Sequence, residues 1–395
     1  MASRTFINGV KHNSLFYNLY FYIGSFFVRS LKVFLRPNPR LIVFSCSSGK
    51  SFSDSPKAIY DSMIKDHRFD DCEIVWDFRN PEKYEIPRGR KIKTDTMGYY
   101  VTILKARVWI TNVSLSRGLD FSGIHTFVFN TWHGSAIKKI GIDVKTGGGT
   151  FASKSSKKRG DVILGQGSYD VERFSHAYEI QEKDVLPIGL PRNDELVYNN
   201  KENVINSLKN KLGIPSDKKV ILYAPTYRDY LKDDKMNSIF DMPFHVDKWE
   251  EKLGKEYVLL FRAHPEIIKV TNLGTGTFVK DVSNYNSINE LMLVSDILIS
   301  DYSSIFFDYS ILRRPMLCYA YDYDEYNDKR GVYFDIRKEL SSEDLCNEET
   351  LINSILNIDY TERIRVAENF RNKYVQEYGN ASRQSLDFIY DVLSN

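Results

Sequence analysis

Short apolar runs recur along the chain, and a polar segment follows each of them. In the first half these runs cover residues 41–44, 72–76, 108–113, 126–129, 161–164 and 185–189. In the second half they cover residues 220–223, 257–261, 277–282, 296–299 and 315–319. Runs of about four to eight apolar residues between turn signals are typical of buried strands. Segments with helical periodicity separate them, so the sequence predicts parallel strands with helices on both faces.

The same pattern predicts two domains. At 395 residues the chain is long for a single core. It turns polar near residues 199–201, and a new cycle of strands and helices begins there. We therefore expect an α/β protein with two Rossmann-like domains, residues 39–200 and 201–395, which face each other across a cleft.

Residues 1–38 form a segment with a different pattern. Residues 15–28 are uncharged and rich in Phe and Tyr, and Arg29, Lys32 and Arg36 follow them. The run is shorter than the roughly 20 apolar residues of a spanning helix, and the order of a signal peptide is missing. Aromatic residues with cationic flanks favour an amphipathic helix on an anionic membrane surface. The alternative is a helix packed on the first domain.

Composition narrows the class of protein. The net charge is only +2, which argues against a nucleic-acid binder. The four cysteines are far apart, so we expect neither a disulfide framework nor a zinc site. Residues 49–51 read Gly-Lys-Ser like the end of a phosphate-binding P-loop, but Phe44 stands where that motif needs its first glycine.

The stretch over residues 130–141 carries the strongest chemical signal of the first half. It reads Asn-Thr-Trp-His-Gly-Ser-Ala-Ile-Lys-Lys-Ile-Gly and directly follows a predicted strand. His133 at the strand end, with Lys138 and Lys139 nearby, suits a general base beside an anionic substrate. The alternative is a histidine that simply packs against Trp132.

Strand-end loops of the second half carry further candidates. They are Arg228, Arg262, His264, Ser303 and Ser304. The serine pair stands where a strand turns into a helix, and the unpaired N–H groups of a helix N-terminus bind phosphate well. The alternative for these serines is simple helix capping.

Two other features are weaker. Residues 145–160 contain a glycine run and the basic residues Lys154, Lys157, Lys158 and Arg159, which indicates either a solvated loop or a mobile lid over phosphates. Asp322 and Asp324 are spaced like a pair that holds a divalent metal on a nucleotide diphosphate, although a solvated turn explains them as well. We therefore expect no firm cofactor and no dedicated metal site. Arginines, histidine and helix N-termini would then neutralise the negative charge of a diphosphate.

Six motifs occur in one order along the chain. They are WHG with KKIG within residues 132–141, PRND at 191–194, APTYRD at 224–229, RAHP at 262–265, SDYSS with FD within 300–308, and RGVYFD at 330–335. Together they resemble the CDP-glycerol glycerophosphotransferase family, the teichoic acid primases and polymerases of Gram-positive bacteria and related capsule polymerases. Ser135 and Ala136 depart from the Thr-Pro-like pair expected after the His-Gly, which leaves His133 intact.

The resemblance implies a glycosyltransferase-B-like fold and a mechanism. Glycerol phosphate would pass from CDP-glycerol to an acceptor hydroxyl, with release of CMP. His133 would be the general base, and His264 would stabilise the diphosphate or protonate the departing phosphate. The implied donor-binding residues are Arg228, Arg262, Asp301, Ser303, Ser304 and Arg330. The implied acceptor-binding residues are Lys138, Lys139 and Arg192.

The resemblance also implies a lipid-linked, phosphate-bearing acceptor and a peripheral position at the cytoplasmic face of the cell membrane. Three alternatives stay open. CDP-ribitol would use the same motifs, because the cytidine diphosphate is shared. A nucleotide-sugar glycosyltransferase of the same fold would release a nucleoside diphosphate instead of CMP. A non-catalytic paralogue would have lost chemical residues, whereas both strand-end histidines and the serine pair are present.

Overall fold

The chain folds into two compact units. A computed structural model describes residues 14–394 apart from 116, 122–124, 145–160, 229–238, 264–266, 268 and 274–275. The first unit takes in residues 1–133, 141–192 and 380–395, and the second takes in residues 134–140 and 193–379.

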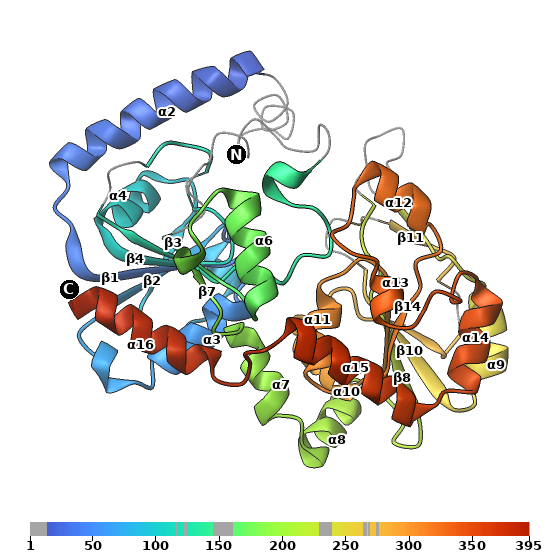
Figure 1. The fold of residues 1–395 in the computed structure, drawn as a ribbon. Coiled ribbons are helices and arrows are strands. Elements are labelled where there is room, and N and C mark those ends of the chain that lie inside the picture. The colour runs from blue at the N-terminus through green and yellow to red at the C-terminus, as the bar shows by residue number, and fades with distance from the viewer. Residues whose placement is uncertain are drawn as a thin grey trace. The chain divides into compact units, whose positions relative to one another are not determined.

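The first unit is built on a seven-stranded parallel sheet (Figure 1). Its strands are β1 (Asn38–Ser45), β2 (Glu73–Phe78), β3 (Arg90–Lys93), β4 (Ala106–Thr111), β5 (Phe127–Asn130), β6 (Val162–Leu164) and β7 (Val185–Leu186). Their spatial order is β3-β2-β1-β4-β5-β6-β7. Because the order reverses between β1 and β4, the loops after these two strands flank the switch point where open α/β sheets bind ligands.

Consecutive apolar residues of β1 are buried on both faces of this sheet. Ile42 and Phe44 pack in one cluster with side chains of α3 (Asp54–Met63) and α16 (Ala381–Ser394). Leu41 and Val43 pack in another with side chains of α4 (Met97–Lys105). An unbroken apolar run is what a parallel strand covered on both faces requires.

The second unit contains a five-stranded parallel sheet with the order β12-β10-β8-β13-β14. Its strands are β8 (Lys219–Tyr223), β10 (Tyr257–Phe261), β12 (Val279–Asp281), β13 (Ile297–Ser300) and β14 (Met316–Cys318). A separate pair is formed by β9 (Ile239–Asp241) and β11 (Lys269–Thr271). The switch point of the larger sheet lies between β8 and β13, so the loops after these strands are the natural ligand-binding positions.

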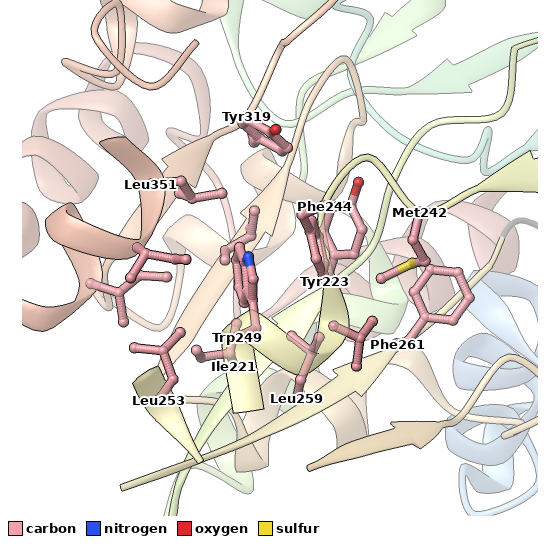
Figure 2. Close-up of a cluster of buried hydrophobic side chains, with 14 of the residues drawn as sticks. Ile221, Tyr223, Met242, Phe244, Trp249, Leu253, Leu259, Phe261, Tyr319 and Leu351 are labelled. Atoms are coloured by element: carbon pink, nitrogen blue, oxygen red, sulfur yellow. The ribbon is translucent and has the colours of Figure 1, made fainter. Parts of the chain in front are cut away.

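Aromatic side chains fill one core of the second unit. Figure 2 shows Trp249 of α9 (Val246–Leu253) among Tyr223, Leu259 and Phe261 of the sheet. Leu351 of α14 (Glu348–Leu356) belongs to the same cluster. The remaining helices are α6 (Ser168–Tyr178), α7 (Asp194–Tyr198), α8 (Glu202–Lys211), α10 (Ile288–Val294), α11 (Ile305–Ser310), α12 (Tyr323–Lys329), α13 (Ile336–Glu339) and α15 (Tyr360–Tyr374).

Two segments differ from the expected domain boundaries. Residues 134–140 belong to the second unit, because their backbone pairs there with residues 331–333. Helix α16 belongs to the first unit, because Leu386, Ile389 and Leu393 are buried in its core beside α3 (Figure 1). The expected boundaries of residues 39–200 and 201–395 are therefore wrong at these two segments.

Helix α2 (Ser14–Phe34) packs on the first unit with one face only. Its Tyr17 and Tyr20 hydroxyls donate to backbone oxygens of Gly118 and Arg117, at 3.2 and 2.9 Å. The other face exposes large apolar side chains, Leu15, Phe16, Leu19, Tyr22, Ile23 and Phe26, each more than half accessible. In the part of the chain that the structure describes, no helix is long and apolar enough to cross a membrane.

Candidate active-site residues

His133 stands in a strained turn directly after β5. Trp132 has a φ of 52° and Gly134 a φ of 131°, and a bulky side chain rarely adopts left-handed backbone. The turn is held because Asn130 Oδ1 accepts a hydrogen bond from Trp132 N at 2.9 Å, and the Trp132 ring is buried against two aromatic side chains of α6. The His133 ring lies 4.1 Å from the Trp132 ring and is still exposed. Such strain persists where surroundings impose it, and it concentrates at functional sites.

A hydrogen bond from Nδ1 orients the His133 ring. Its Nδ1 lies 3.3 Å from the backbone oxygen of Asn112, which follows β4. A carbonyl oxygen can only accept, so Nδ1 carries the proton and the neutral ring has its lone pair on Nε2. This is the protonation pattern that a general base requires.

Arg192 contacts the backbone of the His133 turn, and only 11% of its side chain is exposed. Its Nη1 donates to Asp54 Oδ1 at 2.9 Å, and its Nη2 donates to the backbone oxygen of His133 at 3.2 Å. Burial alone would raise the pKa of the Asp54 carboxyl, but Arg192 and hydrogen bonds from Asn112 and Ser55 hold that pKa below its usual value. The guanidinium is thus engaged within the first unit, and its expected contact with acceptor phosphate stays a prediction.

Lys138 and Lys139 lie in the second unit, although we expected them in the first. Lys138 forms an antiparallel bridge with Val332, and Lys139 N donates to Gly331 O at 3.1 Å. Arg330 Nη1 donates to the backbone oxygen of Lys139 at 2.9 Å. Gly331 has a φ of 77°, and a Cβ there would lie 3.0 Å from Lys139 Cδ, so this close approach favours glycine. The two lysines and Arg330 therefore form one basic segment.

Arg228, which follows β8, is buried between two carboxylates. Its Nη1 donates to Asp301 Oδ2 at 2.9 Å, and its Nε and Nη2 donate to the two oxygens of Asp322 at 2.8 Å each. Burial alone would lower the pKa of Arg228, but Asp301 and Asp322 raise it above its usual value. Asp301 Oδ1 accepts from the backbone N–H groups of Thr226 and Tyr302. This neutralised cluster joins three loops, so the structure gives Arg228 and Asp301 a structural role, and their expected contact with the donor stays a prediction.

The Arg228 cluster contains Asp322, one of the two aspartates considered as metal ligands. Asp322 is bound to Arg228 and to the Tyr302 hydroxyl, whereas Asp324 is exposed on α12. Within the described residues, no group of three or more His, Cys, Asp or Glu side chains is arranged to hold a metal ion. Asp322 thus has a structural partner that accounts for it.

Arg262, which follows β10, has a different environment. Its Nη1 donates to the backbone oxygens of Val282 and Tyr285, at 3.2 and 2.6 Å. Among the described residues no carboxylate pairs with it, and burial lowers its pKa from the usual value. A desolvated cation without a counter-charge is a suitable ligand for an anion.

Ser303 and Ser304 lie at the start of α11, after β13. Both are half-buried, and Ser303 Oγ accepts a hydrogen bond from Ile305 N at 3.3 Å. Ser304 occupies the N-cap position but makes no capping hydrogen bond with its side chain. Capping therefore explains Ser303 in part and leaves the Ser304 hydroxyl without that role.

Two predicted features fall on residues that the structure does not describe. They are His264 and the basic segment 145–160. The prediction for each of them stands on the sequence alone.

Asn112 and Asp54 bind the His133 region and were not among the sequence candidates. Asn112 directly follows β4, and Asp54 is the first residue of α3, at the end of the loop that follows β1. Their place in loops beside the first switch point was the available signal. Neither residue belongs to a motif of reactive groups, so the signal carried no specific chemistry.

Comparison with known proteins places this geometry in a family. A family model described as CDP-Glycerol:Poly(glycerophosphate) glycerophosphotransferase matches residues 26–391. A teichoic acid glycerol-phosphate transferase of Staphylococcus aureus is 34% identical over 90% of this chain and 94% of its own length. A teichoic acid poly(glycerol phosphate) polymerase of Staphylococcus epidermidis is 35% identical over 89% of this chain, which spans only 50% of that relative.

A solved structure agrees with the sequence matches. A structure of the wall teichoic acid polymerase TagF superposes with a TM-score of 0.82 at 32% identity, covering 93% of both chains. Because the family model covers nearly the whole chain, the assignment does not depend on a single motif. The chain belongs to the CDP-glycerol:poly(glycerophosphate) glycerophosphotransferase family.

Proposed function

We propose that this chain transfers glycerol phosphate from CDP-glycerol to a hydroxyl group of a lipid-linked teichoic acid or capsule-type acceptor and releases CMP. The observation that carries the proposal is the exposed His133, whose Nδ1 is bonded to a carbonyl oxygen so that Nε2 holds the lone pair. That is the arrangement of a general base, in a chain of a glycerophosphotransferase family.

His133 Nε2 takes the proton of the acceptor hydroxyl as its oxygen attacks the β-phosphorus of CDP-glycerol. The new oxygen–phosphorus bond forms while the bond from that phosphorus to the bridging oxygen breaks. CMP leaves with the electron pair of the broken bond. Negative charge grows on the phosphoryl oxygens during transfer, so cationic and N–H donors must stabilise it.

Arg262, Ser303 and Ser304 supply such donors in the second unit. Arg262 brings a buried positive charge without a carboxylate partner among the described residues, and the serines stand at the N-terminus of α11. We assign His264 to the departing phosphate from its place beside Arg262 in the sequence. Lys138, Lys139 and Arg330 form the basic segment that we assign to acceptor or donor phosphate.

Glycerol is favoured over ribitol as the transferred polyol. Relatives named as ribitol-phosphate polymerases of Staphylococcus aureus are only 29% and 26% identical, below the glycerol-phosphate enzymes. One of the similar TagF structures comes from a crystal soaked with CDPG. We therefore place CDP-glycerol first and keep CDP-ribitol as the alternative donor.

The test measures CMP release from CDP-glycerol and from CDP-ribitol side by side, with a lipid-linked saccharide acceptor. We expect CMP from CDP-glycerol. His133→Ala should lower kcat by about 10²–10⁴-fold, the usual contribution of a general base, while CDP-glycerol still binds. His67→Ala, at an exposed histidine paired with Asp70, is the matched control and should retain activity. Retained turnover in His133→Ala would remove the assigned base, and CMP from CDP-ribitol alone would change the substrate.

Helix α2 supports a peripheral position on the cytoplasmic face of the membrane. Its exposed apolar side chains include Leu19 and Phe26, at 56% and 73% accessibility. Burying such a face in the headgroup region of an anionic bilayer is favourable. Leu19→Gln with Phe26→Gln should weaken binding to anionic vesicles, whereas Leu356→Gln, at an exposed leucine of α14, should not. Unchanged vesicle binding by the double variant would remove α2 as the anchor.

A further inference from the structure

Asp54 connects the two contacts that hold His133. Its Oδ1 accepts from Arg192 Nη1 at 2.9 Å, and its Oδ2 accepts from Asn112 Nδ2 at 2.7 Å. Arg192 then donates to the His133 backbone oxygen, and the Asn112 backbone oxygen accepts from His133 Nδ1. One carboxylate is thus linked to both the main chain and the ring of His133 through a single intermediate residue each.

The Asn112 side chain fixes one of these links. It is buried, with 2% accessibility, and its Oδ1 accepts from Ser47 N at 2.8 Å while its Nδ2 donates to Asp54. A backbone N–H can only donate and a carboxylate can only accept, so the amide has one orientation that satisfies both. The backbone of Asn112, and with it the acceptor for His133 Nδ1, is therefore held in place by Asp54.

Asp54 has a left-handed backbone conformation, which a helix does not require at its first residue. Asp54 has a φ of 61° at the first residue of α3. The preceding Ser53 occupies the N-cap position in extended backbone, and its side chain makes no capping hydrogen bond. The Asp54 carboxylate instead accepts from Ser55 N at 2.7 Å as well as from Arg192 and Asn112. A left-handed non-glycine residue persists when its contacts require it, and here those contacts lead to His133.

We propose that Asp54 is a positioning residue for the general base His133, which it keeps in the Nδ1-protonated form and in place through Asn112 and Arg192. The inference rests on the proposed function, because it names the residue that prepares the base of that reaction. Asp54 also neutralises Arg192 beside His133. Without the carboxylate, the guanidinium charge would disfavour the imidazolium form of His133 and lower the pKa of that histidine.

Kinetics of Asp54→Asn provide the first test. We expect kcat to fall by about 10–100-fold, as misplaced catalytic groups cause, with KM for CDP-glycerol essentially unchanged. A base acts in its deprotonated form, so a lower pKa of His133 moves the acid limb of the kcat/KM profile to lower pH. Asp61→Asn is the matched control, since Asp61 lies on the same helix and pairs only with Lys57 among the described residues. A native kcat and acid limb in Asp54→Asn would overturn the proposal.

An imidazole measurement separates this proposal from the proposed function. Long-range ¹H–¹⁵N correlation spectra of the ¹⁵N-labelled chain report the tautomer of His133, assigned by the signals lost in His133→Gln. We expect the Nδ1-protonated form in the unaltered chain and a mixture of tautomers in Asp54→Asn. If the unaltered chain released no CMP, the proposed function would fail, while these spectra would still decide the role of Asp54. The same tautomer in both proteins would overturn that role.

Arg192→Lys offers a second variant should Asp54→Asn fail to fold. Lysine keeps the charge beside Asp54 but cannot reach both Asp54 and the His133 backbone as the forked guanidinium does. We expect a lower kcat with an unshifted acid limb, because the carboxylate stays neutralised. A native kcat with native His133 signals in this variant would also overturn the proposal.

Discussion

Two arginines that follow paired strands of one sheet show two uses of a buried cation. Arg228 follows β8 and Arg262 follows β10, and these strands run in parallel with Tyr223 opposite Phe261. Arg228 donates to two carboxylates, whereas Arg262 donates only to backbone oxygens among the described residues. Their pKa values move in opposite directions from the usual one, upward for Arg228 and downward for Arg262.

The difference separates a structural cation from a binding cation. The charge on Arg228 is already neutralised, so removing Arg228 would leave the carboxylates of Asp301 and Asp322 without their counter-charge. Among the residues that the structure describes, no carboxylate pairs with Arg262, so a bound diphosphate would supply its counter-charge. Both arginines stand in strand-end motifs, and residue type alone did not distinguish them.

The largest expected effect is the loss of stability when Arg228 is replaced. Arg228→Met should lower the free energy of unfolding by about 3–5 kcal/mol, because the carboxylates of Asp301 and Asp322 would lose their counter-charge. Urea denaturation followed by circular dichroism measures this loss. Arg365→Met is the control, since Arg365 pairs with Glu362 on the surface of α15 and should leave stability unchanged. A stable Arg228→Met with weakened donor binding would make Arg228 a ligand and remove the comparison.

Arg262→Met should show the opposite pattern. Arg262→Met loses two hydrogen bonds to backbone oxygens but also removes the cost of keeping a desolvated charge, so the urea midpoint should change little. The dissociation constant for CDP-glycerol should increase about 10–100-fold, as expected when a charged hydrogen bond worth about 1.5–3 kcal/mol is lost. Isothermal titration calorimetry measures the affinity, with Arg365→Met again as control. If Arg262→Met unfolded at lower urea and bound CDP-glycerol with unchanged affinity, Arg262 would be a structural cation and not a binding one.

Much of the fold could be predicted because its strands are buried on both faces. All eleven predicted strands are present, and most of them are apolar runs of the kind that a covered parallel sheet needs, although the edge strand β12 reads Val-Lys-Asp. Three of the strands that the structure describes were not predicted. β3 reads Arg-Lys-Ile-Lys at the edge of its sheet, where only Ile92 is buried, and β9 and β11 are three-residue strands that pair outside the main sheet. The boundary errors have another cause, because residues 134–140 and α16 pack on units that are distant along the chain. The hydrophobic periodicity of a segment does not indicate which distant part of the chain that segment packs against.

The positions of the candidate residues were easier to predict than their partners. Strand-end position selected His133 and Arg262 as candidates, and the structure places each of them after a strand. The roles of Arg192 and Arg228 depended on Asp54 and Asp322, which lie far away in sequence. Charge pairing across such separations decides whether a cation is available, and local motifs do not contain it.

A smaller effect is expected where a tyrosine supports the Arg228 cluster. The buried Tyr302 hydroxyl donates to Asp322 Oδ1 at 3.0 Å, and its ring stacks on Tyr326. Tyr302→Phe should lower the free energy of unfolding by about 1 kcal/mol, the usual net value of a hydrogen bond, and leave donor affinity unchanged. Urea denaturation and calorimetry measure the two quantities. If Tyr302→Phe weakened CDP-glycerol binding without lowering the free energy of unfolding, Tyr302 would be a binding residue rather than a structural one.

The smallest effects should separate the two serines at the start of α11. Ser304→Ala removes a hydroxyl that makes no capping bond, so it should weaken CDP-glycerol binding about two- to tenfold without lowering stability. Ser303→Ala should weaken binding to a similar extent and also cost roughly 0.5 kcal/mol of stability, because its Oγ accepts from Ile305 N. Calorimetry and urea midpoints on the two variants distinguish these outcomes. Equal affinity in both variants and the unaltered chain would mean that the serines only begin the helix, and Arg262 would then have to bind the diphosphate without them.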